Sequence, residues 1–474
     1  MPSPSKGPLM SPQPTNALAG LDAQLEGSVL LPGAAGWDDA RAAWNLSVDQ
    51  QPRAIARPRS VRDIRHIIVA ARESGIGVAV QPRGHGANGS LADTILVRTT
   101  AFDEVTVNVV GRFARVGAGV PWGTLLNRLD GTGLVALAGS NPDVSVAGYL
   151  LSGGHSWFSR WKGLAAHSIR AVEMVDAGGV LRRVTRESDP DLLWALRGAA
   201  GLFGVVTVLE IDLFSAPELF GGKLLFPAES AEVVIGAALD ILLDAPPELS
   251  LFLGLINMPD IPTVPELLRG RSFTQVDAVY VGSEAEGQAL LAPLRTIAPV
   301  IADLTHGFSI GQLGDVSAEP QDPSATLDWS TAVTELDAAT IAELLEAFRT
   351  GSYAGLTLLQ IRPLGGVIVD AGVGADGVAG HLDTAFVLFA AAILPPGAPV
   401  PADDVRHLLF QPLEDTLQAV GSPRTVPSLL SAGQDLGAAL APEALERLGE
   451  IKQAIDPENL FRSNRPLPSA YLLP

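Results

Sequence analysis

Hydrophobic and polar residues alternate along residues 54–215 in short, tightly punctuated runs. Apolar side chains at helical spacing predict an amphipathic helix over residues 61–74, and residues 122–129 and 192–196 predict further short helices. Strands are expected at residues 77–81, 94–97, 105–110, 113–116, 169–175, 180–185 and 205–214. The Asp-Ala-Gly-Gly run at 176–179 predicts a hairpin turn.

Longer amphipathic stretches replace this pattern in residues 216–412. Helices are expected at residues 231–243, 283–297 and 338–349, and strand-like runs at 249–255, 274–281, 357–361 and 385–389. This alternation favours an antiparallel sheet covered by helices. From residue 412 the chain is expected to be mostly helical as far as residue 455.

Composition narrows the class of protein. The chain has no cysteine, which excludes disulfides, cysteine-based metal sites and a thiol nucleophile. Its formal net charge of −20 argues against a nucleic-acid or anionic-membrane partner. The scattered histidines show no metal-ligand spacing, so no metal is expected. No apolar run of membrane-spanning or secretory length is found, and cytoplasm is expected, with secretion kept as the alternative.

Three segments carry candidate chemistry. Residues 81–90 follow a strand and surround His85 with glycines, whose backbone N–H groups can approach an anion closely. Residues 139–155 pass from a turn into a short apolar helix and a glycine pair, and residues 189–206 pass from a Pro-initiated helix through small residues into a strand. Taken alone, the first segment is also compatible with an ordinary glycine-rich turn and the second with a packed turn that ends in a C-cap glycine pair. The third carries no nucleophile and is either a scaffold or a nucleobase cradle.

Taken together and in this order, the three segments resemble the FAD-binding module of the vanillyl-alcohol oxidase (PCMH-type) superfamily, in particular its berberine-bridge-enzyme-like oxidases. Residues 456–464 resemble the C-terminal signature of the same family. The resemblance implies an α+β fold, in which an FAD-binding domain formed by both chain ends carries an inserted substrate domain of antiparallel sheet and helices. The implied division is a disordered Pro- and Ser-rich tail at 1–16, FAD-binding residues at 17–215, a substrate domain at 216–412 and a returning segment at 413–474.

The resemblance also implies which residues bind FAD. His85 occupies the position of the histidine that bonds covalently to the flavin, with a non-covalent loop histidine as the alternative. A second, cysteinyl bond is excluded, because Asn141 stands where relatives have that cysteine. The other implied FAD contacts are Arg83, Gly84, Gly86, Asn88, Pro142, Val144, Gly148, Ser152, Gly153, Gly154, Gly204, Val206, Asn459, Phe461 and Asn464.

Some positions depart from the family pattern or bear on the reaction. Val144 lies where a small residue in relatives leaves room for oxygen, which favours an oxidase. Asp143 and Ser145 replace small neutral residues and could re-polarise the pocket. His155 could do the same, although a surface position is expected for it.

The tyrosine that serves many relatives as base or substrate clamp is missing, since no tyrosine occurs between Tyr353 and Tyr471. Gln360 and Arg362 are expected on one face of a strand, toward the flavin, with Arg362 as either an anion clamp or a surface ion-pair partner. His381 is either a base or a structural histidine.

These expectations predict an FAD-dependent oxidase of secondary metabolism. A hydride would pass from a small organic substrate (an alcohol, sugar, alkaloid or secondary metabolite) to flavin N5, and O2 would accept the electrons. The alternatives are a dehydrogenase and a catalytically degenerate flavin-retaining protein.

Overall fold

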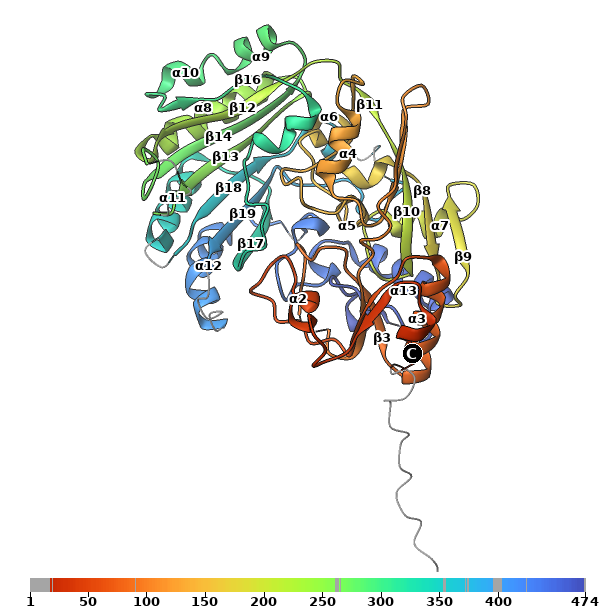
Figure 1. The fold of residues 1–474 in the computed structure, drawn as a ribbon. Coiled ribbons are helices and arrows are strands. Elements are labelled where there is room, and N and C mark those ends of the chain that lie inside the picture. Colours follow the sequence, from red (N-terminus) through yellow and green to blue (C-terminus); the bar gives the residue numbers. More distant parts are fainter. Residues whose placement is uncertain are drawn as a thin grey trace, which may run out of the picture.

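The computed structural model describes residues 18–472, except residues 19, 90, 261–263, 265, 353, 354, 371, 373, 374, 395–402 and 423. The expected N-terminal tail lies outside the described residues. Helices and strands form one mixed architecture (Figure 1), so the expected α+β class is confirmed. Within the described part, no helix combines the length and apolar character needed to cross a bilayer.

The N-terminal part contains a four-stranded sheet in the order β1-β2-β4-β3, in which β2, β4 and β3 run parallel. Helix α3 covers it, with Ile64, Ile67 and Ile68 fully buried and Ser60 capping its N-terminus. A short helix, α2, lies between β1 and β2 along the chain. The elements are β1 (Ser28–Leu30), α2 (Trp37–Arg41), β2 (Ala54–Arg57), α3 (Val61–Ser74), β3 (Gly77–Val80) and β4 (Thr94–Val97).

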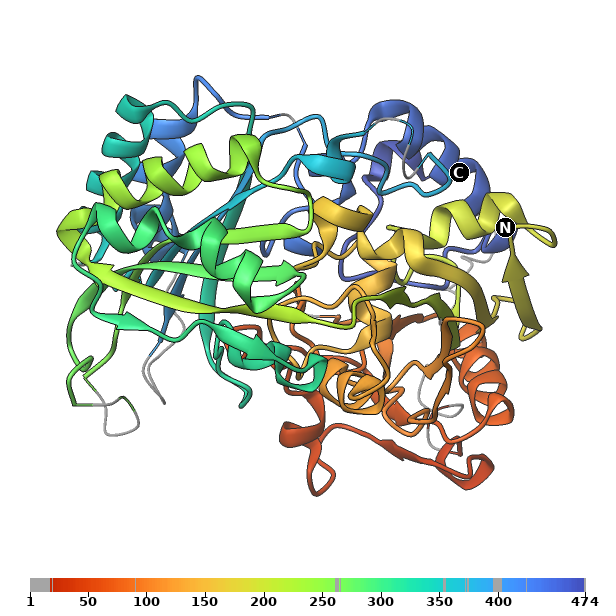
Figure 2. The same ribbon diagram turned by 90° about the horizontal axis from the view of Figure 1, so that it is seen from above.

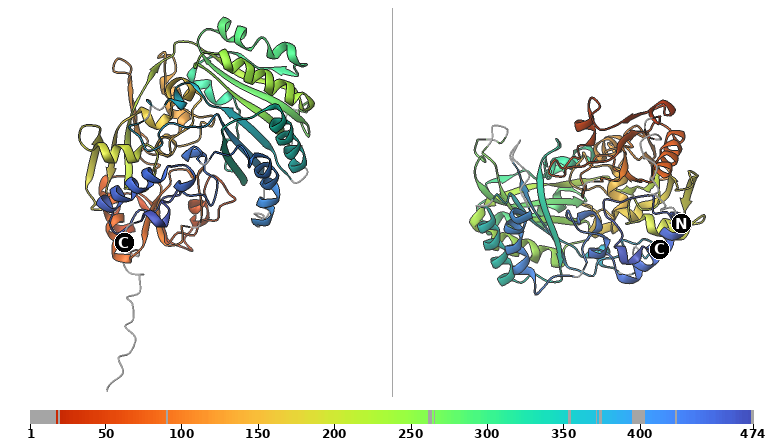
Figure 3. Two further views of the ribbon diagram at one scale, coloured as in Figure 1. Left: turned by 180° about the vertical axis from the view of Figure 1, so that it is seen from behind. Right: turned by 90° about the horizontal axis from the view of Figure 1, so that it is seen from below.

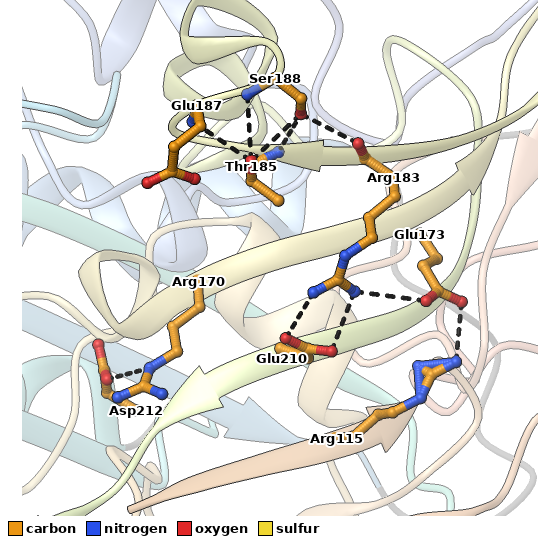
Figure 4. A network of polar contacts seen from close by, with 9 residues as sticks. All are labelled: Arg115, Arg170, Glu173, Arg183, Thr185, Glu187, Ser188, Glu210 and Asp212. Atoms are coloured by element: carbon orange, nitrogen blue, oxygen red, sulfur yellow. Dashed lines mark hydrogen bonds and ion pairs between the residues drawn. The ribbon is translucent and has the colours of Figure 1, made fainter. Parts of the chain in front are cut away.

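A five-stranded antiparallel sheet in the order β5-β6-β10-β8-β9 follows. A network of ion pairs crosses β6, β8, β9 and β10 (Figure 4), in which Arg183 donates to Glu210 from both terminal nitrogens, Nη1 and Nη2. The elements are β5 (Val105–Asn108), β6 (Phe113–Gly117), α4 (Trp122–Leu129), β7 (Leu134–Val135), α5 (Val146–Leu151), α6 (Ser159–Lys162), β8 (Ile169–Val175), β9 (Leu181–Thr185), α7 (Pro190–Leu196), β10 (Val205–Asp212) and β11 (Phe214–Ser215), of which β7 and β11 pair with each other.

The large sheet has the order β15-β12-β14-β13-β18-β19-β17, with β16 also paired to β12, and every pairing in it is antiparallel. Its strands are β12 (Leu219–Pro227), β13 (Leu249–Asn257), β14 (Ser272–Val281), β15 (Ala302–Asp303), β16 (His306–Phe308), β17 (Thr326–Val333), β18 (Leu358–Pro363) and β19 (Phe386–Ile393). The expected antiparallel sheet is confirmed, and β12 and β17 are strands that the hydrophobic pattern did not reveal.

Helices lie along one side of this sheet, as Figures 1 and 3 show. They are α8 (Ala231–Asp244), α9 (Glu284–Leu291), α10 (Leu294–Ile297), α11 (Ala338–Ser352) and α12 (Asp403–Leu417). Their apolar faces and one face of the sheet form a common core, which includes Val234, Leu344 and Leu413. The opposite face of the sheet is therefore left for contacts with the rest of the molecule.

The expectation of mostly helical structure after residue 412 is wrong for residues 418–441. The described residues of this stretch contain only two single-turn 3₁₀ segments, Pro427–Leu429 and Leu436–Ala438. Pro427 and the left-handed Gly433 (φ +87°) interrupt the backbone of this stretch. The expected boundary at residue 412 also falls inside a helix, because α12 continues through Pro412 to Leu417.

The C-terminal segment returns to the N-terminal part, where α13 (Pro442–Ile455) lies beside α7 (Figure 2). Buried Lys452 donates hydrogen bonds to Asp456 Oδ2 (2.6 Å) and to the carbonyls of Leu202 and Phe461. Leu460 then pairs by its backbone with Val78 of β3. These hydrogen bonds hold residues 463–465 beside the glycine-rich loop that follows β3.

Candidate functional site

A cavity of about 400 Å³ lies between the N-terminal part and the face of the large sheet that the helices leave uncovered. Segments far apart in the sequence line it: residues 80–86, 139–152, 200–201, 358–362, 427–430 and 463–465. The expected site residues that line it are Arg83, Gly84, His85, Gly86, Asn141, Val144, Gly148, Ser152, Gln360, Arg362 and Asn464.

The loop after β3 forms one end of the cavity. Gly84 has φ +95°, and a Cβ there would lie 2.9 Å from Ala43 Cα, so the tight curve needs glycine. At Gly86 an added Cβ would meet only Arg465 Nη2, at 3.8 Å, which leaves the loop open on that side. The buried Nε of Arg83 has no hydrogen-bond partner among the described residues. An open backbone curve with an unsatisfied cationic donor fits a bound pyrophosphate.

His85 is held from two sides. Its ring stacks on Trp44 with 4.2 Å between centroids and 17° between planes. Its Nε2 lies 3.4 Å from Asp143 Oδ2, while the other carboxylate oxygen of Asp143 accepts a hydrogen bond from Arg83. Asp143, a departure from the family pattern, therefore joins the first two segments of the site.

Tyr149 projects from α5 into the cavity and was not expected in the site. It is wedged between two glycines: a Cβ at Gly139 would lie 3.0 Å from its ring, and one at Gly154 would lie 2.6 Å away. Its buried hydroxyl has no partner in the described structure, and burial strongly raises the pKa of Tyr149. Asn141 is fixed nearby, since its Nδ2 donates to the Pro320 carbonyl.

Strand β18 supplies the opposite wall. Gln360 and Arg362 both line the cavity, as their alternation predicts, and Arg362 Nε donates to Gln360 Oε1 (2.6 Å). Arg362 is 8 % exposed and lies over the ring of Phe252. The structure therefore contradicts the surface ion-pair alternative for Arg362.

His155 is also buried in the cavity wall, at 4 % exposure, and the expectation that it lies on the surface is wrong. The glycine pair before it turns the chain inward, with left-handed backbone at both Gly153 and Gly154. Burial lowers the pKa of His155 to about 3, and the nearby charge of Arg362 acts in the same direction. Its imidazole is therefore neutral at physiological pH, and its Nδ1 finds no partner among the described residues.

The remaining expected FAD contacts do not line the cavity: Asn88, Pro142, Gly153, Gly154, Gly204, Val206, Asn459 and Phe461. Several of them instead support residues that do. Asn88 donates to the carbonyl of Asn464, and Gly204 allows close approach to β8, where its Cβ would lie 2.5 Å from Val175 O. Asn459 adopts left-handed backbone (φ +48°) in the C-terminal turn, and Phe461 is buried in the core.

His381 lies outside the cavity lining, and its Nε2 is paired with Asp383 Oδ1 at 2.8 Å. Trp44, which stacks on His85, and Glu319 are further cavity residues for which no role was expected. The Gly-Tyr-Leu-Leu run of the second segment was the available signal for Tyr149. Glu319 lies in an irregular stretch, where periodicity gives no signal.

Comparison with known proteins agrees with this geometry. Residues 52–185 match the family model of the FAD binding domain. The chain is 27 % identical over 455 residues to (R)-6-hydroxynicotine oxidase of Paenarthrobacter nicotinovorans, an alignment that covers 93 % of this chain and 96 % of the oxidase.

Solved structures share the fold at lower identity. The berberine-bridge-enzyme-like protein 1 of Physcomitrella patens superposes with a TM-score of 0.80 at 19 % identity, over 96 % of this chain and 99 % of that one. Berberine bridge enzyme from Eschscholzia californica gives 0.78 at 16 % identity, with the same coverage. The resemblance to FAD-linked oxidases, the fold and FAD as cofactor are thus confirmed.

Proposed function

We propose that this FAD-linked oxidoreductase is an oxidase that removes a hydride from a small organic substrate and passes the electrons to O2. The observation that carries the proposal is that segments from both chain ends and from β18 line one cavity. When bound there, FAD supplies a hydride acceptor at its N5 atom. The protein then has to bind, orient and deprotonate the substrate.

The cofactor would be held by the N-terminal wall. The open backbone at Gly86 and the unsatisfied Nε of Arg83 suit its pyrophosphate, and Asn464 extends this surface from the C-terminal segment. Val144 lines the same space, which supports access of O2 as in relatives with a small residue there. The hydrogen-bond donors for the pyrophosphate are local, so its binding does not depend on the net charge of the protein.

We further propose that FAD is bound covalently through His85 alone. If the Nε2 hydrogen is directed at Asp143, the lone pair of the imidazole resides on Nδ1, which is then free to act as nucleophile. Stacking on Trp44 fixes the plane of the ring. Asn141, in the position of the relatives' cysteine, has an amide side chain that cannot form a second bond of this kind.

Proton removal is assigned to Glu319. Two carboxylates line the cavity within the described residues, and Asp328 is engaged by Arg406 at 3.6 Å, whereas no ion pair of 4.0 Å or less involves Glu319. His155 is too weakly basic and Tyr149 too weakly acidic for this role, because burial shifts the pKa of each toward its neutral form.

The test starts from the purified protein. Its visible spectrum should show a flavin, and the yellow colour should stay with the pellet after acid precipitation, whereas His85→Ala should release it to the supernatant. A colourless wild-type protein contradicts the whole proposal, and colour that washes out of wild type contradicts the covalent bond alone. After anaerobic photoreduction, reoxidation within seconds of admitting air supports the oxidase, and reoxidation over many minutes supports a dehydrogenase.

A further inference from the structure

Arg362 is a buried cation that has no ion-pair partner within 4.0 Å among the described residues. It stands on the central part of the large sheet, where its guanidinium lies 4.5 Å from the ring centroid of Phe252 and 5.8 Å from that of Phe389. One hydrogen bond, from Nε to Gln360, orients it. Both terminal nitrogens, Nη1 and Nη2, make no hydrogen bond to the described residues.

The other buried cations are satisfied within the protein. Arg98 donates to three backbone carbonyls, and Arg197 donates to carbonyls and pairs with Asp376. Lys223 and Lys452 each bond a buried carboxylate at 2.6 Å. A guanidinium does not lose its proton in a protein, so burial without such partners is costly unless something else supplies them.

Four neutral groups line the same cavity with a buried atom that has no partner among the described residues: Trp122 Nε1, Tyr149 Oη, His155 Nδ1 and Ser428 Oγ. Two of them, Tyr149 and His155, lie near enough to Arg362 for its charge to act on their pKa. Buried polar atoms are nearly always bonded, so Arg362 and these two residues in one cavity indicate a missing ligand. The aromatic rings beside Arg362 add an apolar wall.

Two internal candidates for the missing partner can be set aside. Asp277 is bonded by Lys223 and Ser317, and no carboxylate oxygen of Glu319 comes within 4.0 Å of the Arg362 guanidinium. The pyrophosphate of FAD would occupy the opposite wall, at the loop of Arg83. The partner of Arg362 is therefore sought in the substrate.

We infer that the substrate carries a carboxylate, which Arg362 binds through Nη1 and Nη2 while Tyr149 and His155 complete the hydrogen bonds of its anionic end. This inference rests on the proposed function and specifies its substrate class as organic acids. A planar carboxylate matches the two-pronged donor edge of a guanidinium. Gln360 acts as a positioning residue for that edge.

The test uses flavin-loaded protein and a matched pair of probes, benzoate and its neutral analogue benzamide, with acetate and phenylacetate as further acids. Each is titrated while perturbation of the flavin absorbance is followed. Wild type should bind benzoate more tightly than benzamide. Arg362→Met should weaken benzoate binding by at least about 30-fold and leave benzamide within about twofold, because a buried charge partner is lost. Arg362→Lys should fall between the two proteins.

A control variant, Arg349→Met, removes an exposed arginine on α11 and should bind both probes as wild type does. The inference is overturned if no acid perturbs wild type, if Arg362→Met weakens both probes equally, or if the variant loses its flavin. A wild-type protein that shows no flavin spectrum before any titration contradicts the proposed function, and is thereby distinguished from failure of this inference.

Discussion

Charged side chains are arranged in opposite ways on the five-stranded sheet and in the cavity. On the sheet, Arg183 is 49 % exposed and reaches both Glu210 and Glu173. Arg115 shares Glu173 with it, and Arg170 pairs with Asp212 (Figure 4). In the cavity, Arg362 is 8 % exposed and has no such partner among the described residues.

The difference separates stability from binding. Exposed pairs are weak because water solvates each charge almost as well as its partner does. A buried polar group without a partner costs free energy in the isolated protein and regains it when a ligand supplies the partner. Where the protein itself supplies the partner of a buried charge, as at Lys452, the free energy of that interaction stabilises the folded state. The following predictions test this division, beginning with the largest effect.

Lys452→Met should lower the free energy of unfolding by about 3–5 kcal/mol, because it leaves the Asp456 carboxylate buried without its counterion. Urea unfolding followed by fluorescence measures the change. Arg72→Met removes an exposed pair with Glu458 on the same C-terminal turn and should cost at most about 1 kcal/mol. Equal losses in the two variants would contradict the contrast between buried and exposed pairs.

His155→Gln should alter the pH dependence of stability. The pKa of His155 is about 3 in the folded protein, below its unfolded value, so the unfolded chain binds more protons between about pH 3 and 6.5. Stability contributed by this group is present above pH 6.5 and lost as the pH falls, by about 1.4 kcal/mol per pH unit. The variant should lack this slope in urea unfolding between pH 4.5 and 6.5.

The control for that measurement is His306→Gln, which removes an exposed histidine and should keep the wild-type slope. If His155→Gln and wild type lose stability in parallel on acidification, His155 is not held neutral by burial. A histidine at position 155 that was exposed to solvent would also require a more open cavity wall than the 4 % exposure of His155 indicates.

Much of the fold was predictable because its elements have local signals. Apolar spacing gave both bounds of α3 and α4, and the Gly-Gly turn gave the β8–β9 hairpin. Strand β12 was missed because Gly221 and Gly222 interrupt its hydrophobic pattern. Those glycines are needed for neighbours distant in sequence: a Cβ at either would lie about 2 Å from a carbonyl oxygen of another segment.

The site was predictable to a different extent. The order of glycine-rich segments indicated FAD and drew attention to His85, since such loops have a local sequence pattern. The environment of Arg362 depends on which carboxylates come near it in three dimensions, and that of Tyr149 on two glycines that frame its ring. The local spacing of residues indicates neither that Arg362 lacks a partner nor that His155 is buried.

Tyr149→Phe should leave the free energy of unfolding unchanged or raise it by up to about 1 kcal/mol, because the hydroxyl removed is buried and unbonded. The same variant should weaken benzoate binding about 3- to 10-fold. Thermal unfolding of the flavin-loaded protein and the flavin titration provide the two readouts. A clear loss of stability with unchanged binding would place Tyr149 among the structural residues.

Arg183→Gln should have the smallest effect, at most about 1 kcal/mol at pH 7, since both partners are partly solvated. The hydrogen bond from Arg183 lowers the pKa of Glu210 in the folded protein, so the pair stabilises the fold above the unfolded pKa of this carboxyl. That contribution is lost as the pH falls through the folded pKa, and wild type and variant should then unfold at the same urea concentration. Added salt at pH 7 should narrow the difference in the same way, whereas the buried charge of Lys452 should respond to salt very little. A difference of several kcal/mol, or one that salt leaves untouched, would mean that the outer network of the five-stranded sheet stabilises the fold as strongly as the buried pair does.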